Sequence, residues 1–104
     1  MQQWLYRIRP TRLEMLVSGG TPAERAVLAQ HFAWLKQRCE AGVVQLAGRS
    51  LTSDEHSFGL VIFQAPDEAA ALQVMNDDPA VRAGLFRAEL FPWRIALPQQ
   101  DPDD

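Results

Sequence analysis

The sequence predicts a single α+β domain with the element order strand, helix, strand, strand, helix, strand. Three observations carry this prediction. A capping box with proline in the first helical position, TPAE at 21–24, marks the start of a long helix. Two β-rich runs flank a polar turn at 52–57, as in a hairpin. A second helical pattern follows and ends before Asp78, because the proline after Asp78 disfavours helical geometry at that residue.

Two segments near the N-terminus are candidates for the first strand. In RLEMLV at 12–17, Leu13, Met15 and Val17 share one face and Glu14 lies on the other. WLYRIR at 4–9 is strand-like too, and a proline marks a break or edge position between the two runs. The expected strand before the first helix is 12–17, and the role of 4–9 stays open.

The first helix is expected to run to about Ala41, since Gly42 supplies the usual left-handed stop. At 100° per residue, His31 lies about 60° from Leu28, on the shoulder of the apolar stripe. The single cysteine excludes an internal disulfide, and its helical pattern favours a buried small hydrophobe over a nucleophile. The stripe that would face the core consists of Leu28, Phe32, Leu35 and Cys39.

The remaining elements are two hairpin strands, a second helix and a last strand. The hairpin joins 43–52 to 58–65, and the latter run is apolar at nearly every position, as in a strand covered on both faces. The second helix is expected from Pro66 to about Asp77. In the last strand the apolar positions change phase beyond Pro92, which predicts a bend or bulge there.

This order is the ferredoxin-like split βαβ arrangement, a four-stranded antiparallel sheet. Right-handed crossovers place both helices on one face of the sheet. The economical cover for the other face is a second copy of the chain, which would give a homodimer through the sheet face, a dimeric α+β barrel. The domain is expected to span residues 1–97, and 98–104 to form a polar, acidic tail.

Charge and hydropathy exclude several classes of partner. The net charge is −3, and the terminal DPDD supplies three negative charges, so the body is near neutral, unlike a nucleic-acid or membrane binder. SFGLVIF at 57–63 is similar to an RNA-recognition strand, but Leu60 stands where a stacking aromatic is required. No apolar run is long enough to cross a bilayer. We expect a cytoplasmic protein that binds neither nucleic acid nor membrane.

Cofactor and metal chemistry find no support in the motifs. The glycines before the first helix lack the spacing of either nucleotide fingerprint. His31, Cys39 and His56 show no paired ligand spacing, and no serine lies in a nucleophile elbow. We therefore expect no cofactor and no metal site.

The best candidate for chemistry is the pair His31 and Asp78. Taken alone, His31 is better explained as a half-buried histidine bonded to backbone, and Asp78 as a helix-boundary residue. Both helices lie on one sheet face, however, so the end of the second could reach the middle of the first. A carboxylate that holds one imidazole nitrogen makes the other a better base. Asp77 is left with a local role at the helix end.

Four further residues are candidates for contact with a substrate. Arg49, after Gly48, could pair with a substrate carboxylate or equally with a surface acid. Gly48 and Gly84 would allow a ligand to approach the backbone, although a packing role is as good an explanation. Trp34 lies on the same helix shoulder as His31.

Several strings in this order resemble the YciI-like (YCII-related) family of dimeric α+β barrel proteins. They are HxxWL at 31–35, EAG at 40–42, LAGRSL at 46–51, FGLVIF at 58–63, DDPAVRAGLF at 77–86 and ELFPWRIAL at 89–97. The resemblance implies site roles for His31 and Asp78, a homodimer, and kinship with muconolactone-type isomerases and lyases. Many members carry Gly-Pro at 48–49, where this chain has Gly-Arg, so the pocket wall differs.

Two functions follow as hypotheses. In the first, the protein is a cofactor-independent enzyme in which His31, oriented by Asp78, abstracts a proton next to the carbonyl of a small organic acid, lactone or similar compound. In the second, the same homodimer binds a small ligand or a protein partner without catalysis.

Overall fold

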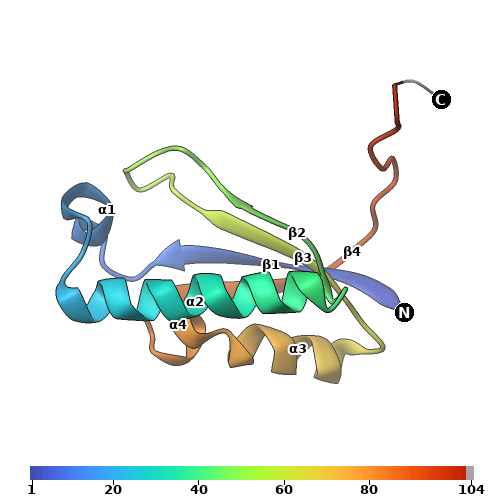
Figure 1. Ribbon diagram of the computed structural model, residues 1–104, viewed down its shortest axis with the longest axis horizontal. Coiled ribbons are helices and arrows are strands. Elements are labelled where there is room, and N and C mark those ends of the chain that lie inside the picture. The colour runs from blue at the N-terminus through green and yellow to red at the C-terminus, as the bar shows by residue number, and fades with distance from the viewer. Residues whose placement is uncertain (103–104) are drawn as a thin grey trace.

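The computed structural model describes residues 1–102 as four strands and four helices (Figure 1). In chain order these are β1 (Gln2–Pro10), α1 (Glu14–Ser18), α2 (Pro22–Glu40), β2 (Val44–Arg49), β3 (Gly59–Ala65), α3 (Glu68–Asp77), α4 (Pro79–Arg82) and β4 (Phe86–Trp93). Of the tail predicted at 98–104, the structure describes residues 98–102.

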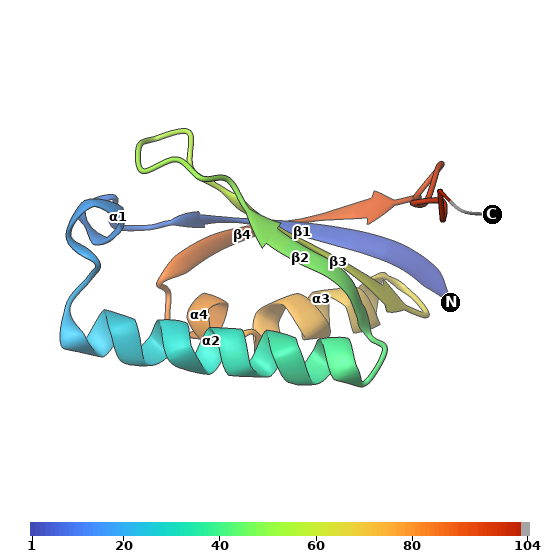
Figure 2. The same ribbon diagram turned by 45° about the horizontal axis from the view of Figure 1, so that its top comes forward.

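The four strands form one antiparallel sheet in the order β2-β3-β1-β4. Helices α2, α3 and α4 all lie against one face of this sheet (Figures 1 and 2). The ferredoxin-like prediction is therefore confirmed. Because β1 and β3 are the central strands, they supply most of the side chains buried between sheet and helices.

The core lies between the sheet and the helices. Tyr6 and Phe63 are fully buried at its centre and meet edge to face, with 5.7 Å between ring centroids. The buried core cluster consists of Trp4, Tyr6, Ile8, Val44, Val61, Phe63, Ala65, Ala71 and Met75.

The strand expected at 12–17 is a wrong prediction. The first strand is β1, which contains 4–9, and residues 14–18 form the short helix α1. Only Met15 of the three alternating residues is buried, whereas Leu13 is 39% exposed and Val17 77% exposed. Three apolar residues at alternate positions are too few to distinguish a strand from a short helix, because the five residues that they span make little more than one helical turn.

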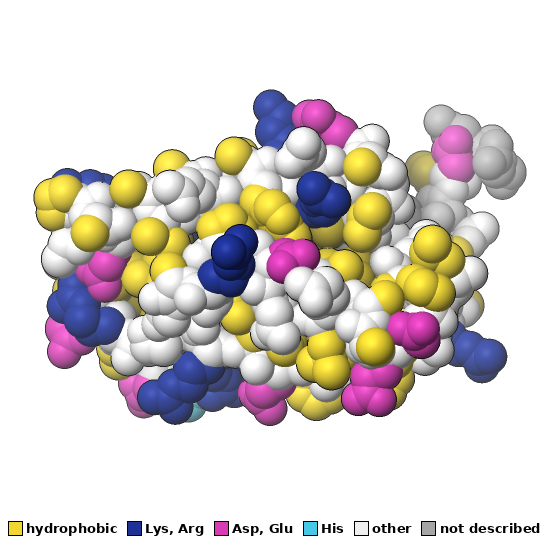
Figure 3. Space-filling model, turned by 90° about the horizontal axis from the view of Figure 1, so that it is seen from below, with side chains coloured by type: hydrophobic (Ala, Val, Ile, Leu, Met, Phe, Trp, Pro, Cys, Tyr) yellow, Lys and Arg dark blue, Asp and Glu magenta, His cyan; other side chains and the backbone are white. Residues whose placement is uncertain are grey.

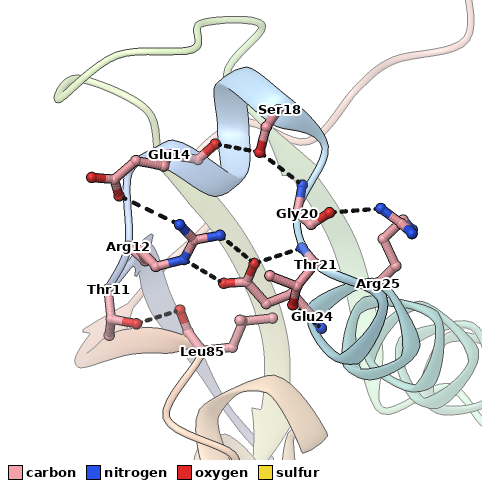
Figure 4. Close-up of polar contacts among 9 residues, drawn as sticks. All are labelled: Thr11, Arg12, Glu14, Ser18, Gly20, Thr21, Glu24, Arg25 and Leu85. Carbon is pink, nitrogen blue, oxygen red and sulfur yellow. Dashed lines mark hydrogen bonds and ion pairs between the residues drawn. The ribbon is translucent and has the colours of Figure 1, made fainter.

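A polar junction fixes the turn from β1 through α1 into α2 (Figure 4). The predicted capping box is present: Thr21 accepts from the Glu24 backbone N–H, and Glu24 accepts from that of Thr21. Arg12 donates to both carboxylate oxygens of Glu24, at 2.6 and 3.0 Å. Thr11 donates through its hydroxyl to the Leu85 carbonyl at 3.1 Å, which ties this junction to the start of β4.

The apolar stripe of α2 packs differently from the prediction. Leu28 and Leu35 contact the core clusters, but Phe32 is 70% exposed and Cys39 is exposed, so the expectation of a buried cysteine was wrong. The physical reason is that the β2–β3 hairpin diverges from α2 toward its loop (Figures 1 and 2). This side of α2 therefore faces a cavity instead of packed side chains.

The bulge expected near Pro92 is also absent from the described pairing of β4. This strand pairs with β1 in continuous register from Phe86 to Trp93. Proline is tolerated because β4 is an edge strand, where a missing N–H removes no ladder bond on the outer side. The phase change instead reflects side chains on both faces: Leu90 packs against the core, whereas Phe91 points to the open face.

The surface carries charges of both signs. In the view from below, acidic and basic side chains are interspersed along the edges, with apolar side chains between them (Figure 3). None of the helices in the described part of the chain is long and apolar enough to cross a membrane.

Candidate functional site

The two residues that the sequence analysis paired are in direct contact. His31 lies midway along α2, and Asp78 lies between α3 and α4. The His31 Nδ1 atom is 2.6 Å from Asp78 Oδ1. The Asp78 side chain is fully buried, whereas 13% of the His31 side chain is exposed. The histidine therefore lies between the buried carboxylate and a solvent-accessible space.

Local backbone geometry sets the position of Asp78. Pro79 forces the residue before it out of the helix, and Asp78 has φ −59° and ψ 121°. Its backbone N–H still donates to Met75 O at the end of α3, while its side chain caps α4 by accepting from Ala80 N at 3.0 Å. The residue thus ends one helix and begins the next, which fixes the direction of its carboxylate.

Tyr6 is a further hydrogen-bond partner of the Asp78 carboxylate, and it was not among the site residues predicted from the sequence. Its hydroxyl donates to Asp78 Oδ2 at 2.8 Å. Burial, followed by the charge of Asp78 and the hydrogen bond to it, raises the pKa of the Tyr6 phenol far above its ordinary value, so the phenol remains a donor. The available signal was the alternation of β1, which places Tyr6 on the same face as Trp4 and Ile8.

The arrangement selects one tautomer of His31. An ionised carboxylate only accepts hydrogen bonds, so the hydrogen lies on Nδ1 and the lone pair on Nε2. Within residues 1–102, Nε2 has no hydrogen-bond partner. The ring also meets Phe86 edge to face, with 5.4 Å between centroids, which limits its rotation. An oriented imidazole with a free basic nitrogen is suited to general-base chemistry.

His31 forms part of the wall of a cavity of about 610 Å³ between α2 and the β2–β3 hairpin. This volume is in the usual range of small-molecule sites. Most of the wall is apolar. The lining residues are Ile8, Pro10, Leu16, Leu28, His31, Phe32, Leu35, Lys36, Cys39, Val44, Ala47, Gly48, Arg49, Ser50, Thr52, Ser57, Phe58, Gly59, Leu60, Val61 and Phe86.

The four predicted substrate contacts divide into two pairs. Gly48 and Arg49 line the cavity at the end of β2. Trp34 and Gly84 do not line it. The Arg38 guanidinium carbon Cζ lies 5.8 Å from the centroid of the Trp34 ring. Gly84 adopts a positive φ in the turn before β4. Among residues 1–102, no group of three or more histidine, cysteine or acidic side chains is arranged to hold a metal ion.

Fold and site together define a small ferredoxin-like α+β protein in which a buried carboxylate holds a histidine beside an apolar cavity. The chain belongs to the YCII-related family, whose domain model matches residues 5–94.

One similar solved structure is 5-chloro-2-hydroxyhydroquinone dehydrochlorinase from Burkholderia phenoliruptrix AC1100, in complex with 2,5-dihydroxybenzoquinone. It is 22% identical, with a TM-score of 0.60, and the match covers 90% of this chain and 94% of that one. The comparison with curated proteins found no match.

Proposed function

We propose that the protein is a cytoplasmic, cofactor-independent enzyme that moves a proton on a small carbonyl compound, organic acid or lactone, as a lyase or an isomerase. The observation that carries this proposal is the free Nε2 of His31, which borders an apolar cavity while Nδ1 is held by Asp78. A cytoplasmic setting fits the single, exposed Cys39 thiol.

In the proposed reaction, His31 Nε2 takes a proton from the carbon next to the substrate carbonyl. The electron pair of the broken C–H bond moves onto the carbonyl oxygen and forms an enolate. The negative charge of Asp78 stabilises the imidazolium that results. The enolate then either re-forms the carbonyl and expels a leaving group from the adjacent carbon, or, where it is conjugated with a C=C bond, takes the proton back from His31 at the far carbon of that bond. The first outcome is elimination, and the second is isomerisation.

The named activity of the similar structure supports this reaction class. A dehydrochlorinase removes hydrogen chloride, and loss of a proton and a chloride ion is an elimination. At 22% identity the likeness carries the fold alone, so the substrate of that enzyme enters here only as one compound to test.

We further propose that the protein works as a homodimer through the open sheet face. Alternation and register place Leu5, Ile62 and Phe91 side by side on that face, opposite the helices. Trp93 and Leu46 belong to the same face and remain 44% and 62% exposed. Leu5 and Ile62 are already buried in the single chain, and a second copy would cover Phe91, Trp93 and Leu46 while leaving the cavity on the other side of the sheet accessible.

Solvent deuterium exchange tests the catalytic proposal, because it detects removal of the proton whatever the product is. The protein is incubated in D₂O with a panel of lactones, keto acids and the chlorinated hydroquinone, and NMR follows loss of the acidic C–H signal. We expect the wild type to catalyse exchange or chloride release and His31→Ala to be about 100-fold slower or worse. The matched control is His56→Ala, because His56 is 79% exposed and does not line the cavity.

Equal rates for the wild type and His31→Ala would contradict the role given to His31. Binding of panel members with no exchange would favour the second hypothesis, a non-catalytic ligand-binding homodimer.

A further inference from the structure

The charged residues around the cavity are all basic. Lys36 and Arg49 line it together with His31, and no acidic side chain lines it within the described residues. Lys36 is the only lysine in the sequence. Elsewhere, Arg7 and Arg12 pair with glutamates at 2.6 Å.

The two cavity cations have no such partner within residues 1–102. The only hydrogen bond of the Arg49 side chain goes from Nε to the Ser50 carbonyl at 3.3 Å, and Lys36 makes no ion pair. Two unpaired cations in a space without acids favour an anionic ligand.

The hydroxyl groups of the cavity are already used. Ser50 Oγ and Thr52 Oγ1 are 2.8 Å apart, and Thr52 Oγ1 and Ser57 Oγ are 3.0 Å apart. Ser50 Oγ also accepts from Phe58 N at 3.0 Å, so these groups brace the hairpin loop. Because the hydroxyls satisfy one another, the wall is poorly suited to a sugar or another polyol, and the cations remain the main polar contacts for a ligand.

The rest of the wall determines what the body of the ligand has to be. The apolar side chains that line the cavity between His31 and the hairpin come from α2 and from all four strands of the sheet. They include Ile8, Leu28, Leu35, Val44, Val61 and Phe86. Burial of apolar surface against such a wall stabilises an apolar body and disfavours a hydrated one.

The positions of His31, Lys36 and Arg49 in the fold set the extent of the ligand. Arg49 pairs with Gly59 and Gly59 with Ile8, so the three lie in one row across β2, β3 and β1. His31 contacts Phe86, which lines the same cavity from β4, the edge strand opposite β2. A molecule that contacts His31, Lys36 and Arg49 together therefore spans the cavity between α2 and the end of β2. Lys36 is five residues beyond His31, about 7.5 Å along the helix axis.

We propose that the ligand of this cavity is an amphipathic carboxylate, whose anionic group lies between Lys36 and Arg49 and whose apolar body extends toward His31. This inference rests on the proposed function because both proposals assign a ligand to the same cavity. Lys36 and Arg49 would orient the molecule so that its reactive carbon reaches Nε2. The binding claim stands or fails independently of catalysis.

A ligand series separates charge from apolar contact. Butyrate, hexanoate, octanoate and decanoate are compared with their primary amides by calorimetry. We expect the affinity of the acids to rise about fourfold per added methylene until the cavity is filled. We expect each longer acid to bind at least about 10-fold more tightly than its amide.

Paired variants assign the preference to the two cations. In the double variant Lys36→Gln, Arg49→Gln the ratio of amide to acid dissociation constants should fall to about 1. It should persist in Arg82→Gln, a control at an exposed α4 position outside the cavity lining. Equal binding of acids and amides, a ratio unchanged in the double variant, or no binding of either series would each overturn the proposal. Loss of exchange in His31→Ala with no acid preference would overturn only this inference and leave the catalytic proposal standing.

Discussion

The phenol of Tyr6 donates a 2.8 Å hydrogen bond to Oδ2 of Asp78, the carboxylate oxygen that His31 does not contact. Oδ1 accepts from His31 and from the Ala80 backbone N–H. Three donors hold this fully buried carboxylate in one orientation. Tyr6 is therefore a positioning residue that acts on His31 through Asp78.

Tyr6 makes the protein sensitive to alkali. Because the pKa of this phenol is raised in the folded state, its contribution to stability is complete below the ordinary tyrosine pKa of 10.0. That contribution is lost as the pH rises above this value, by up to about 1.4 kcal/mol per pH unit, since the unfolded chain ionises and the folded chain does not. Urea unfolding between about pH 9 and pH 12 should show this slope in the wild type and not in Tyr6→Phe.

The control is built into the chain, because Tyr6 is its only tyrosine. Tyrosinate absorbance should appear together with unfolding. Its appearance in the folded protein would contradict the buried, hydrogen-bonded phenol. At neutral pH, Tyr6→Phe should be about 1.5–3 kcal/mol less stable because it leaves Asp78 Oδ2 without its donor.

Asp78→Asn should keep the tautomer of His31 but lose the negative charge. The Ala80 N–H requires an acceptor at the Oδ1 position, so the amide oxygen stays toward His31, and the amide NH₂ turns to Tyr6, whose hydroxyl can accept. We expect exchange rates roughly 10- to 100-fold below wild type, because the imidazolium loses a charged partner. Kinetics together with ¹⁵N spectra of His31 check both parts.

Asp78→Ala is the informative comparison for that variant. It leaves the Tyr6 hydroxyl, the Ala80 N–H and His31 Nδ1 without their acceptor, so we expect a loss of roughly 3 kcal/mol in the free energy of unfolding. If Asp78→Asn and Asp78→Ala were equally stable, the three hydrogen bonds would not have the importance given to them here.

Glu24 should contribute to acid resistance. The hydrogen bonds from Arg12, and next the one from the Thr21 backbone, lower the pKa of Glu24 to about 2 (Figure 4). A lowered pKa gives stability that is present above the ordinary value of 4.5 and is lost as the pH falls toward 2. Denaturant unfolding of wild type and Glu24→Gln should therefore differ most above this window and converge through it.

Glu14→Gln is the matched control, since Glu14 is exposed and lies 3.9 Å from the same arginine. We expect this change to have little effect at any pH. A difference between wild type and Glu24→Gln that did not shrink on acidification would contradict the role of the Arg12 contact.

The proposed dimer predicts a change of mass in solution. The wild type should sediment as a dimer, and Phe91→Glu, which places a charge on the open sheet face, should sediment as a monomer. Leu72→Glu is a matched control, because Leu72 on α3 is 39% exposed and Phe91 38% exposed. A monomeric wild type, or a dimer that persists in Phe91→Glu, would rule out this interface.

Helices whose first or last residues carry characteristic capping or stop residues could be predicted from the sequence. The capping box at Thr21, the Gly42 stop and the Pro79 boundary are local chemistry, and the structure has all three. The contact of His31 with Asp78 followed from packing two helices on one sheet face. Their role in catalysis stays a proposal.

Features that depend on tertiary contacts could not be predicted. The choice between 4–9 and 12–17 depended on which run pairs with two neighbouring strands, and β1 pairs with both β3 and β4. Tyr6 looked like one of several strand aromatics, because its partner is distant in the sequence. Cys39 lies at the spacing of the apolar stripe on its helix, but that side of the helix faces a cavity, so the thiol is exposed.

The central claim is that Asp78 holds His31 with an unprotonated Nε2 toward the cavity. Long-range ¹H–¹⁵N NMR at about pH 9 measures this directly, and the sequence has only two histidines to assign. The structure predicts that His31 carries its hydrogen on Nδ1 and shows the shift of a bare nitrogen at Nε2, and the exposed His56 serves as the internal reference. A hydrogen on Nε2 of His31 would contradict the claim.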